Sequence, residues 1–297
     1  LERLAANQRP EPSPAAPRSR DGEPLLLSFY AVDDYLTCPL KYRFGHVLRV
    51  PPAPHHSLIY GSALHAAVSE FHKRHARGDV MSEDDLVASF VAAWRSEGFL
   101  SREHEEARLD AGRASLRRFR EEQLRPGAII PAYVEREFSF LLDGDRVRGR
   151  YDRVDIILRD GAAPEVLAAA HDEAAADVVE PVMFTYPEHV VITDYKSSDV
   201  RDPAKARQRA KESLQLSIYA MGYEAMTGRL PDAVALSFLE TGLVGTVPVD
   251  RKRIDKARES IRTAATGIRA REFSAKPDLL ACTWCAYREI CPSSAAR

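Results

Sequence analysis

The chain has 297 residues, of which 45% are hydrophobic and 29% charged, and its formal net charge is −2. A chain of this length can bury a full hydrophobic core, so it needs no cross-link for reasons of size alone. The nearly neutral charge excludes a strongly basic, histone-like nucleic-acid binder, and the apolar runs are too short to span a bilayer. The start of the chain also lacks the apolar stretch of a signal peptide, so we expect a cytoplasmic protein.

Residues 1–24 have the composition of a linker. They are rich in Pro, Ala, Arg and Glu and contain few large apolar side chains. Such a segment cannot bury enough surface to fold, so we predict that it is disordered. The first residue is not Met, so we expect either a piece of a longer polypeptide, with a larger part upstream, or a processed chain. We expect residues 25–297 to form the folded domain.

Helical patterns follow in the next hundred residues. Ser28 is a good N-cap for a helix over about 30–44. A second helix is predicted over about 59–77, and more helix over 82–125, where large apolar residues recur at helical spacing. The N-terminal part of the domain is therefore predicted to be helical.

The pattern then changes to that of strands. Residues 133–142, 145–158 and 189–198 alternate or run apolar, and the pair Asp143-Gly144 indicates a hairpin between the first two. Residues 159–188 are Ala-rich, acidic and weakly patterned, so we predict an insertion at the next hairpin. A helix over 203–227, strands over 233–240 and 244–250, and a helix over 251–271 complete the order. This order predicts an α/β or α+β core with a mixed central sheet flanked by helices.

Asp194 and Lys196 lie two residues apart in a predicted strand. Their side chains therefore project from one face, whereas Tyr195 points to the other. Hydrolysis of a phosphodiester needs a group that neutralises developing charge, and a divalent metal held by carboxylates supplies this and lowers the pKa of its bound water. Oxygen ligands suit Mg²⁺ or Mn²⁺, and a nearby lysine can orient water or stabilise the transition state.

Asp152 is the best candidate for a second carboxylate. It ends a strand face that carries Arg146, Arg148 and Arg150 and that turns apolar after it, as at the floor of a cleft. The alternative is that Asp152 and Asp155 simply pair with Arg150 and Arg153 on a solvated strand, which is the commoner outcome for an isolated pattern of this kind.

Three further side chains are candidates for the same site. Gln215 and Tyr219 lie at positions i and i+4, hence on one helix face, and can contact a phosphate or base. His65, in GSALHAAVSEF, is a possible metal ligand. For a helix histidine, simple exposure or burial in the core is the more frequent explanation.

Four of these segments, GSALH, GRYDRVD, ITDYKSS and QLSIY, resemble in the same order the motifs of PD-(D/E)xK nucleases of the RecB type. The resemblance spans about residues 26–292 and implies a restriction-endonuclease-like core. It also implies that a divalent metal is bound by His65, Asp152, Asp194 and the backbone carbonyl of Tyr195. Lys196 would then assist hydrolysis, and Gln215 and Tyr219 would place DNA, so that the catalytic set is Asp152, Asp194, Lys196, Gln215 and Tyr219. The long acidic stretch over 159–188 departs from the family pattern.

The four cysteines form a second feature. Cys282, Cys285 and Cys291 have the spacing C-x₂-C-x₅-C, and Cys38 is far upstream. Their clustering in a chain without a secretory signal favours metal ligation over disulfides. Four thiolates suit either zinc or an iron–sulfur cluster, and the spacing alone does not decide between them. The arrangement resembles the iron staple of AddB-type and CRISPR-adaptation nucleases, which implies a structural [4Fe–4S] cluster, with zinc as the alternative.

Basic residues near the predicted site are candidate contacts to a DNA backbone. They comprise Lys205, Arg207 and Arg209 at the start of one helix, Arg148 and Arg150 on the Asp152 strand, and the cations of residues 251–271. A solvated helix face is the usual explanation of such runs. Beside a phosphate-cleaving site they predict salt-sensitive contacts that do not depend on base sequence.

The linker-like start and the resemblance together imply a C-terminal nuclease domain of a bacterial helicase–nuclease, of the AddAB, AdnAB or UvrD-like sort. Such a domain would cut single-stranded DNA ends, fed by a helicase motor, in double-strand break repair. The chain has no G-x-x-x-x-G-K-[ST] motif, so it carries no P-loop ATPase itself. The alternatives are a stand-alone exonuclease like those of CRISPR adaptation, a DNA-binding module of the same fold that does not cut, and a cluster-bearing redox protein.

Overall fold

The structure, a computed structural model, describes residues 23–157 and 189–296. The predicted insertion and nearly all of the predicted linker therefore lie outside the described residues. The described residues divide into two compact units: a larger unit contains 53–142, 146–157 and 189–259, and a smaller unit contains 23–52, 143–145 and 260–296.

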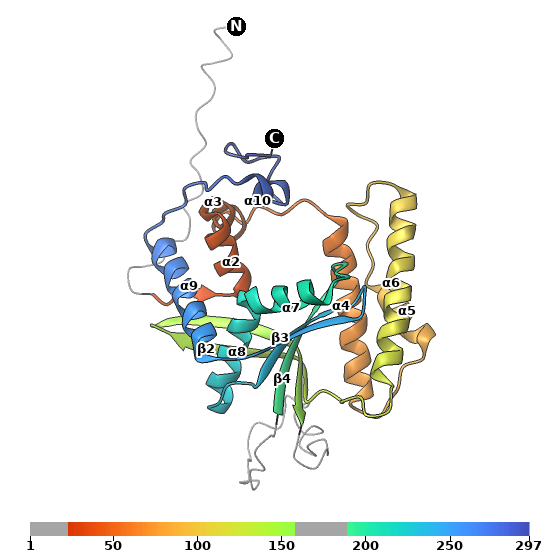
Figure 1. Cartoon of the computed structure of the whole chain (residues 1–297). Coiled ribbons are helices and arrows are strands. Elements are labelled where there is room, and N and C mark those ends of the chain that lie inside the picture. Colours follow the sequence, from red (N-terminus) through yellow and green to blue (C-terminus); the bar gives the residue numbers. More distant parts are fainter. Residues whose placement is uncertain (1–22, 158–188, 297) are drawn as a thin grey trace. The chain divides into compact units, whose positions relative to one another are not determined.

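A mixed sheet forms the centre of the larger unit (Figure 1). Its order is β3-β4-β5-β6, with β2 paired to β3. β3 and β4 are antiparallel, β4 and β5 are parallel, and β5 and β6 are antiparallel. The strands are β2 (Tyr133–Leu142), β3 (Asp145–Ile157), β4 (His189–Lys196), β5 (Ala233–Phe238) and β6 (Leu243–Pro248). All were predicted to within two residues at each end.

The hairpin between β2 and β3 is confirmed. Asp143 and Gly144 have φ values of 51° and 88°. Two consecutive left-handed residues make the turn whose twist matches that of the flanking strands, and Asp-Gly is a favoured pair for it. This turn sets the register that brings Asp152 to its place on β3.

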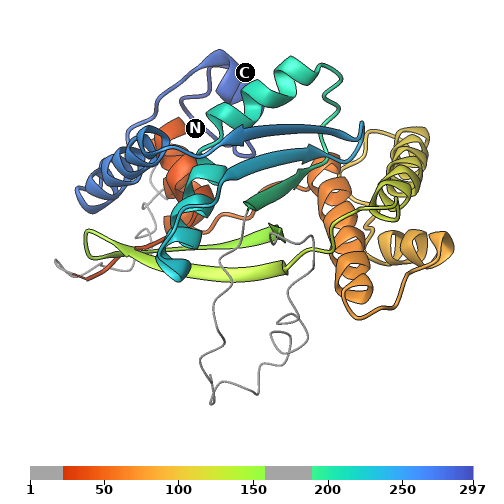
Figure 2. The same cartoon turned by 60° about the horizontal axis from the view of Figure 1, so that its bottom comes forward.

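Helices cover the sheet and pack beside it (Figure 2). α7 (Pro203–Glu212) and α8 (Leu214–Thr227) lie against the strands. α4 (His56–His75), α5 (Glu83–Ala92) and α6 (Arg102–Gln123) pack on one another. Their buried residues, among them Leu64, Phe71 and Phe119, form one hydrophobic cluster that also contains Tyr195 of β4. The predicted α/β class, a mixed sheet flanked by helices with a helical N-terminal region, is therefore confirmed.

Three of the predicted helical stretches are interrupted. The stretch over 82–125 breaks after Ala92, and Ser101 caps the next helix with its side chain. The stretch over 203–227 breaks at Ser213, whose ψ of 111° is extended and whose side chain accepts the N–H of Leu216. The prediction of one long helix over 203–227 was wrong because a serine side chain can cap a new helix instead of continuing an old one.

The helix predicted over 30–44 is also divided. In the smaller unit, α2 (Phe29–Thr37) ends at the extended residue Cys38, and Pro39 opens α3 (Pro39–Tyr42), which runs into a π-helix over Arg43–Val47. A proline is tolerated in a first helical turn but disfavours helical backbone in the residue before it. The break therefore falls on Cys38 for a local, physical reason.

The rest of the smaller unit contains β1 (Leu26–Leu27), the end of α9 (Arg251–Arg269) and the short α10 (Leu279–Thr283). Asp145 accepts hydrogen bonds from the Leu25 N–H and from Arg269. The Tyr35 hydroxyl donates to the carbonyl of Glu272 at 2.9 Å. Across the described part of the chain, no helix is both long enough and apolar enough to cross a membrane.

Candidate active site and cysteine site

Asp152 lies where β3 and β4 stop pairing. Their register ends at Arg153 opposite Thr193. One residue further, Asp152 Oδ2 accepts the backbone N–H of Tyr195 at 2.8 Å. The carboxylate thus satisfies a backbone donor that the ladder leaves unpaired, and it is held between the two strands rather than in solvent.

His65 comes to Asp152 from α4. Its Nδ1 lies 3.5 Å from Asp152 Oδ2, and its Nε2 lies 3.0 Å from the carbonyl oxygen of Tyr195. α4 approaches the end of β4 closely, because a Cβ at Gly61 would lie 3.0 Å from Ser197 Oγ. A small residue one turn before the histidine therefore allows the approach, which explains the glycine of GSALH.

Glu135 joins these two residues, and the sequence analysis missed it. Ligand atoms of His65, Glu135 and Asp152 all lie within 4.8 Å of one another, and this is the one such set within the described residues. Glu135 has a φ of 55°, which is unusual in a strand. At such a residue the regular alternation of side chains between the two faces of the sheet is interrupted. Nothing in YVEREF distinguishes it from Glu137, so only the backbone conformation reveals it.

Asp194, Lys196, Gln215 and Tyr219 form a hydrogen-bonded group beside that set. Asp194 is 2% exposed. Its Oδ1 accepts from Gln215 Nε2 at 2.7 Å and from the Tyr219 hydroxyl at 3.3 Å, and its Oδ2 lies 2.7 Å from Lys196 Nζ. Lys196 Nζ also donates to Gln215 Oε1 at 2.8 Å. The Gln-Tyr face of α8 therefore contacts the Asp194 and Lys196 side chains of β4.

The electrostatics of the site are set by burial. Burial, together with the charge of Asp194, raises the pKa of Asp152 to about 8. Burial also lowers the pKa of His65, so that its imidazole is neutral, the form that ligates metals. A divalent cation would offset the repulsion between the carboxylates and displace the proton of Asp152. Two carboxylates and an imidazole converging in this way fit a divalent metal such as Mg²⁺ or Mn²⁺.

The alternative interpretation, in which Asp152 and Asp155 pair with arginines on a solvated strand, holds only in part. Asp155 pairs with Arg153 at 2.8 Å, but both side chains are buried, not solvated. Arg150 pairs with Glu135 at 2.6 Å, so that it borders the proposed metal ligands. Asp152 accepts a backbone N–H instead of pairing with an arginine.

The predicted DNA-contacting residues occupy exposed positions. Arg148 is exposed on β3, and Lys205 and Arg207 are exposed on α7. Arg209 donates to Ser198 Oγ at 3.1 Å, close to the end of β4. The buried face of α7 is formed by Ala206 and Ala210, so its cations face away from the sheet.

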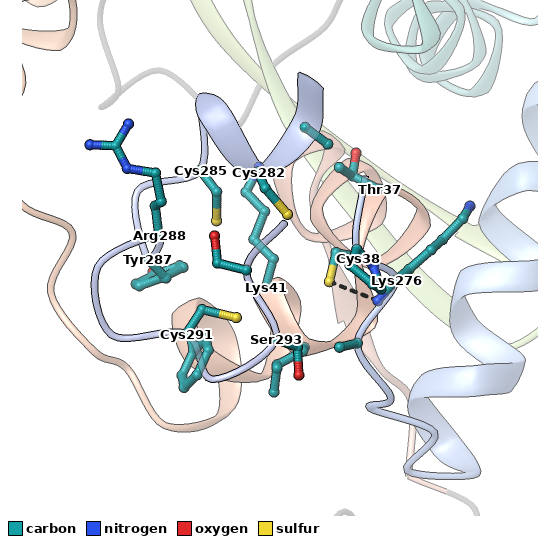
Figure 3. A pocket seen from close by; sticks show the side chains of 16 residues that line it. Thr37, Cys38, Lys41, Lys276, Cys282, Cys285, Tyr287, Arg288, Cys291 and Ser293 are labelled. Atoms are coloured by element: carbon teal, nitrogen blue, oxygen red, sulfur yellow. Dashed lines mark hydrogen bonds between the residues drawn. The ribbon is translucent and has the colours of Figure 1, made fainter. Parts of the chain in front are cut away.

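All four cysteines line one pocket in the smaller unit, and all are free thiols (Figure 3). Their sulfurs point into the same space, and the backbone N–H of Lys276 donates to Cys38 Sγ at 3.4 Å. Lys41 also lines the pocket and is held by Asp34 at 2.7 Å. Thiols, a lysine and a backbone N–H around one pocket fit a site for an anionic metal–thiolate group.

Comparisons with known proteins place the chain in a family. No curated protein matches it. Among solved structures it is similar to a protein from Eubacterium rectale designated "Putative exonuclease", with 13% identity, 84% of each chain covered and a TM-score of 0.45. It is also similar to the protein SSO0001, with 11% identity, 94% of this chain and 90% of that chain covered, and a TM-score of 0.39. The family model described as the PD-(D/E)XK nuclease superfamily matches residues 26–167 and 173–292, and the chain therefore belongs to that superfamily.

Proposed function

We propose that this protein is a metal-dependent deoxyribonuclease. The observation that carries the proposal is the convergence of His65, Glu135 and Asp152, within 4.8 Å of one another, beside the Asp194–Lys196–Gln215 group. His65, Asp152, Asp194 and the Tyr195 carbonyl would hold Mg²⁺ or Mn²⁺, with Glu135 as an additional ligand. When bound, such a cation neutralises charge on a phosphodiester and lowers the pKa of a bound water.

The residues around the metal have separate tasks in this mechanism. Lys196 Nζ, fixed by Asp194 and Gln215, places a positive charge beside the proposed metal ligands, where it can stabilise charge on the attacking water or the phosphate. Gln215 holds both Lys196 and Asp194 with one amide group, and Tyr219 donates to the same carboxylate. The pair thereby fixes the orientation of two charged groups before substrate arrives.

The test is cleavage of end-labelled single-stranded DNA in the presence of Mg²⁺ or Mn²⁺. We expect the wild type to cut and Asp194→Ala to lose cleavage, while Asp84→Ala, which removes an exposed carboxylate on α5, cuts like the wild type. A circular single-stranded substrate separates the two modes of attack, because an exonuclease leaves it intact. Equal cleavage by the wild type and Asp194→Ala would refute the proposal.

We further propose that DNA follows the exposed cations Arg148, Lys205, Arg207 and Arg209, with Arg150 at the metal centre. Each contact to phosphate releases a counterion, so the slope of log affinity against log salt should fall by about 1 for each lysine or arginine removed. This would be measured by fluorescence anisotropy on DNA of two unrelated sequences.

The cellular role proposed is that of a RecB-type nuclease domain, acting as an exonuclease on single-stranded ends fed by a helicase motor in double-strand break repair. It is supported by the resemblance of four segments, in the same order, to the motifs of RecB-type nucleases. A native gene without helicase motifs upstream would favour instead a stand-alone exonuclease like those of CRISPR adaptation.

The cysteine pocket is proposed to hold a [4Fe–4S] cluster bound by Cys38, Cys282, Cys285 and Cys291. The support is the pocket that all four cysteines line and the resemblance of their arrangement in the sequence to the iron staple of AddB-type nucleases. The role assigned to the cluster is structural, since it would join the N-terminal helix to the C-terminal segment of the smaller unit.

A further inference from the structure

Tyr195 separates the proposed metal ligand Asp194 from Lys196, and its own peptide groups face the metal centre. Its N–H donates to Asp152 Oδ2 at 2.8 Å, and its carbonyl oxygen lies 3.0 Å from His65 Nε2. The backbone of this one residue thus contacts two of the proposed ligands. Any rotation of the peptide would move both contacts.

The side chain of Tyr195 is anchored on the opposite face of β4. It is 3% exposed. Its hydroxyl lies 2.7 Å from His72 Nε2 and 3.5 Å from Arg153 Nη1. An arginine can only donate, so the hydroxyl accepts from Arg153, and it shares a second hydrogen bond with the His72 ring. Burial keeps the pKa of His72 well below its usual value, so its imidazole is neutral and can accept.

Two neighbouring elements therefore hold Tyr195 from both faces. α4 contacts its carbonyl through His65 and its hydroxyl through His72, seven residues and about 10 Å further along the helix. β3 contacts its N–H through Asp152 and its hydroxyl through Arg153. α4 and β3 thus each carry one residue at the proposed metal centre and one residue that contacts the Tyr195 hydroxyl.

The support behind the strand is itself rigid. Arg153 is 8% exposed and donates to both oxygens of Asp155 at 2.8 and 2.9 Å. Its remaining donors reach Gln123 Oε1 at 2.6 Å and the carbonyl of Ile129 at 2.9 Å. A buried charge costs free energy, and a buried polar network that is fully bonded holds one arrangement. The network therefore presents the Tyr195 hydroxyl with a fixed partner.

We infer that the Tyr195 hydroxyl, with His72 and Arg153, positions the metal centre from the far side of the sheet. By fixing the side chain, this group fixes the rotation of the peptide, and with it the directions of the carbonyl oxygen, His65 and Asp152. Tyr195, His72 and Arg153 are positioning residues, and the side chain between Asp194 and Lys196 is part of the site. The inference rests on the proposed function.

The test compares Tyr195→Phe with Tyr151→Phe. The first deletes only the anchored hydroxyl and keeps the ring and the carbonyl. The second is a matched control: Tyr151 is fully buried, and its hydroxyl has no hydrogen-bond partner within the described residues. Mn²⁺ affinity is measured by calorimetry, melting temperature is measured without metal, and cleavage is measured as a function of Mn²⁺ concentration.

Loss of a group that orients a metal ligand typically weakens metal affinity by about 10-fold or more. We expect Tyr195→Phe to bind Mn²⁺ roughly 10-fold more weakly and to need correspondingly more Mn²⁺ for half-maximal cleavage. Its rate at saturating Mn²⁺ should approach that of the wild type. Tyr151→Phe should match the wild type in Mn²⁺ affinity and in cleavage, and its melting temperature should not fall, because it removes a buried hydroxyl that has no partner. A merely structural hydroxyl would lower the melting temperature and leave the Mn²⁺ affinity unchanged.

A second pair of variants keeps the test decisive if Tyr195→Phe does not fold. His72→Gln retains an acceptor for the hydroxyl and should keep most of the Mn²⁺ affinity, whereas His72→Leu should lose it as Tyr195→Phe does. Wild-type Mn²⁺ affinity in Tyr195→Phe or in His72→Leu would overturn the inference while leaving the proposed function intact. A wild-type protein that binds no Mn²⁺ and cuts no DNA would overturn both.

Discussion

Asp152 is a proposed metal ligand, and its burial lowers the free energy of unfolding of the metal-free protein at high pH. Burial and the charges of Asp194 and Glu135 raise its pKa to about 8 in the metal-free protein, whereas in an unfolded chain it is about 3.9. Between these values the folded protein keeps a proton that the unfolded chain has released. For this group, the free energy of unfolding therefore falls as the pH rises toward 8 and recovers as the pH falls.

Replacing this carboxylate should stabilise the metal-free protein at high pH. We expect Asp152→Asn to raise the free energy of unfolding in EDTA at pH 9 by on the order of 1 kcal/mol, with little gain at pH 5. Added Mn²⁺ should stabilise the wild type and not the variant. Thermal melts at both pH values measure this. Asp155→Asn is the contrasting control, since it leaves the buried Arg153 unpaired and should destabilise at both pH values.

Glu135 shows where residue patterns stop being informative. Asp152, Asp194, Lys196, Gln215, Tyr219 and His65 were all predicted because their spacing repeats known motifs, and the structure brings them into two adjoining groups. Glu135 depends on a left-handed backbone conformation within a strand. Such a conformation arises from tertiary packing and leaves no mark in a pattern of alternating residues.

We expect Glu135→Gln to weaken Mn²⁺ binding by about 10-fold, because it removes a negative charge from the His65–Glu135–Asp152 set. Glu137→Gln, two residues along the same strand and exposed, should bind Mn²⁺ like the wild type. Calorimetric titration of both variants measures the difference. Equal affinities would remove Glu135 from the metal centre.

At the scale of elements, the strands could be predicted from local signals, whereas the break between α7 and α8 could not. Strand periodicity and the Asp143-Gly144 turn are local signals, so β2 to β6 were predicted nearly to the residue. The break between α7 and α8 depends on a side chain from a distant element. Arg253 donates to the carbonyls of Ala210, Lys211 and Ser213 and to Ser217 Oγ. These carbonyls at the end of α7 have no partners within that helix, and Arg253 supplies them.

The same arginine fixes the start of α8, where Gln215 is the second residue. We expect Arg253→Met to lower the free energy of unfolding by about 2 kcal/mol, because it leaves several carbonyls without a donor. Cleavage should slow as Gln215 loses its position. Lys252→Ala, an exposed neighbour on α9, should change stability by less than about 0.5 kcal/mol. Urea denaturation measures both, and an unchanged midpoint for Arg253→Met would contradict this role.

At the scale of the whole molecule, more of the arginines form ion pairs within the protein than the sequence indicated. The run of cations over 251–271 was interpreted as candidate DNA contacts. In the structure, Arg251 and Arg258 pair with Glu224, and Arg262 and Arg269 pair with Asp143 and Asp145. Such partners lie far away in the sequence, so a linear count of charges cannot reveal them. The exposed cations of α7 therefore remain the stronger candidates for contacts to DNA.

The four cysteines that line one pocket come from two distant parts of the described chain. Cys38 precedes Cys282 by 244 residues (282 − 38), and both lie in the smaller unit, around one pocket. A covalent link across a loop of this size restricts the unfolded chain by about 5 kcal/mol in the chain-entropy model.

We expect Cys38→Ser to lose iron and visible absorbance and to melt at a clearly lower temperature than the wild type. Ser293→Ala, which alters the same pocket without removing a thiol, should keep both. Metal analysis of anaerobically purified protein should find about four irons per wild-type chain. A result of one zinc and no iron would contradict the cluster. A Cys38→Ser protein that keeps its full iron content and its melting temperature would contradict the link through Cys38.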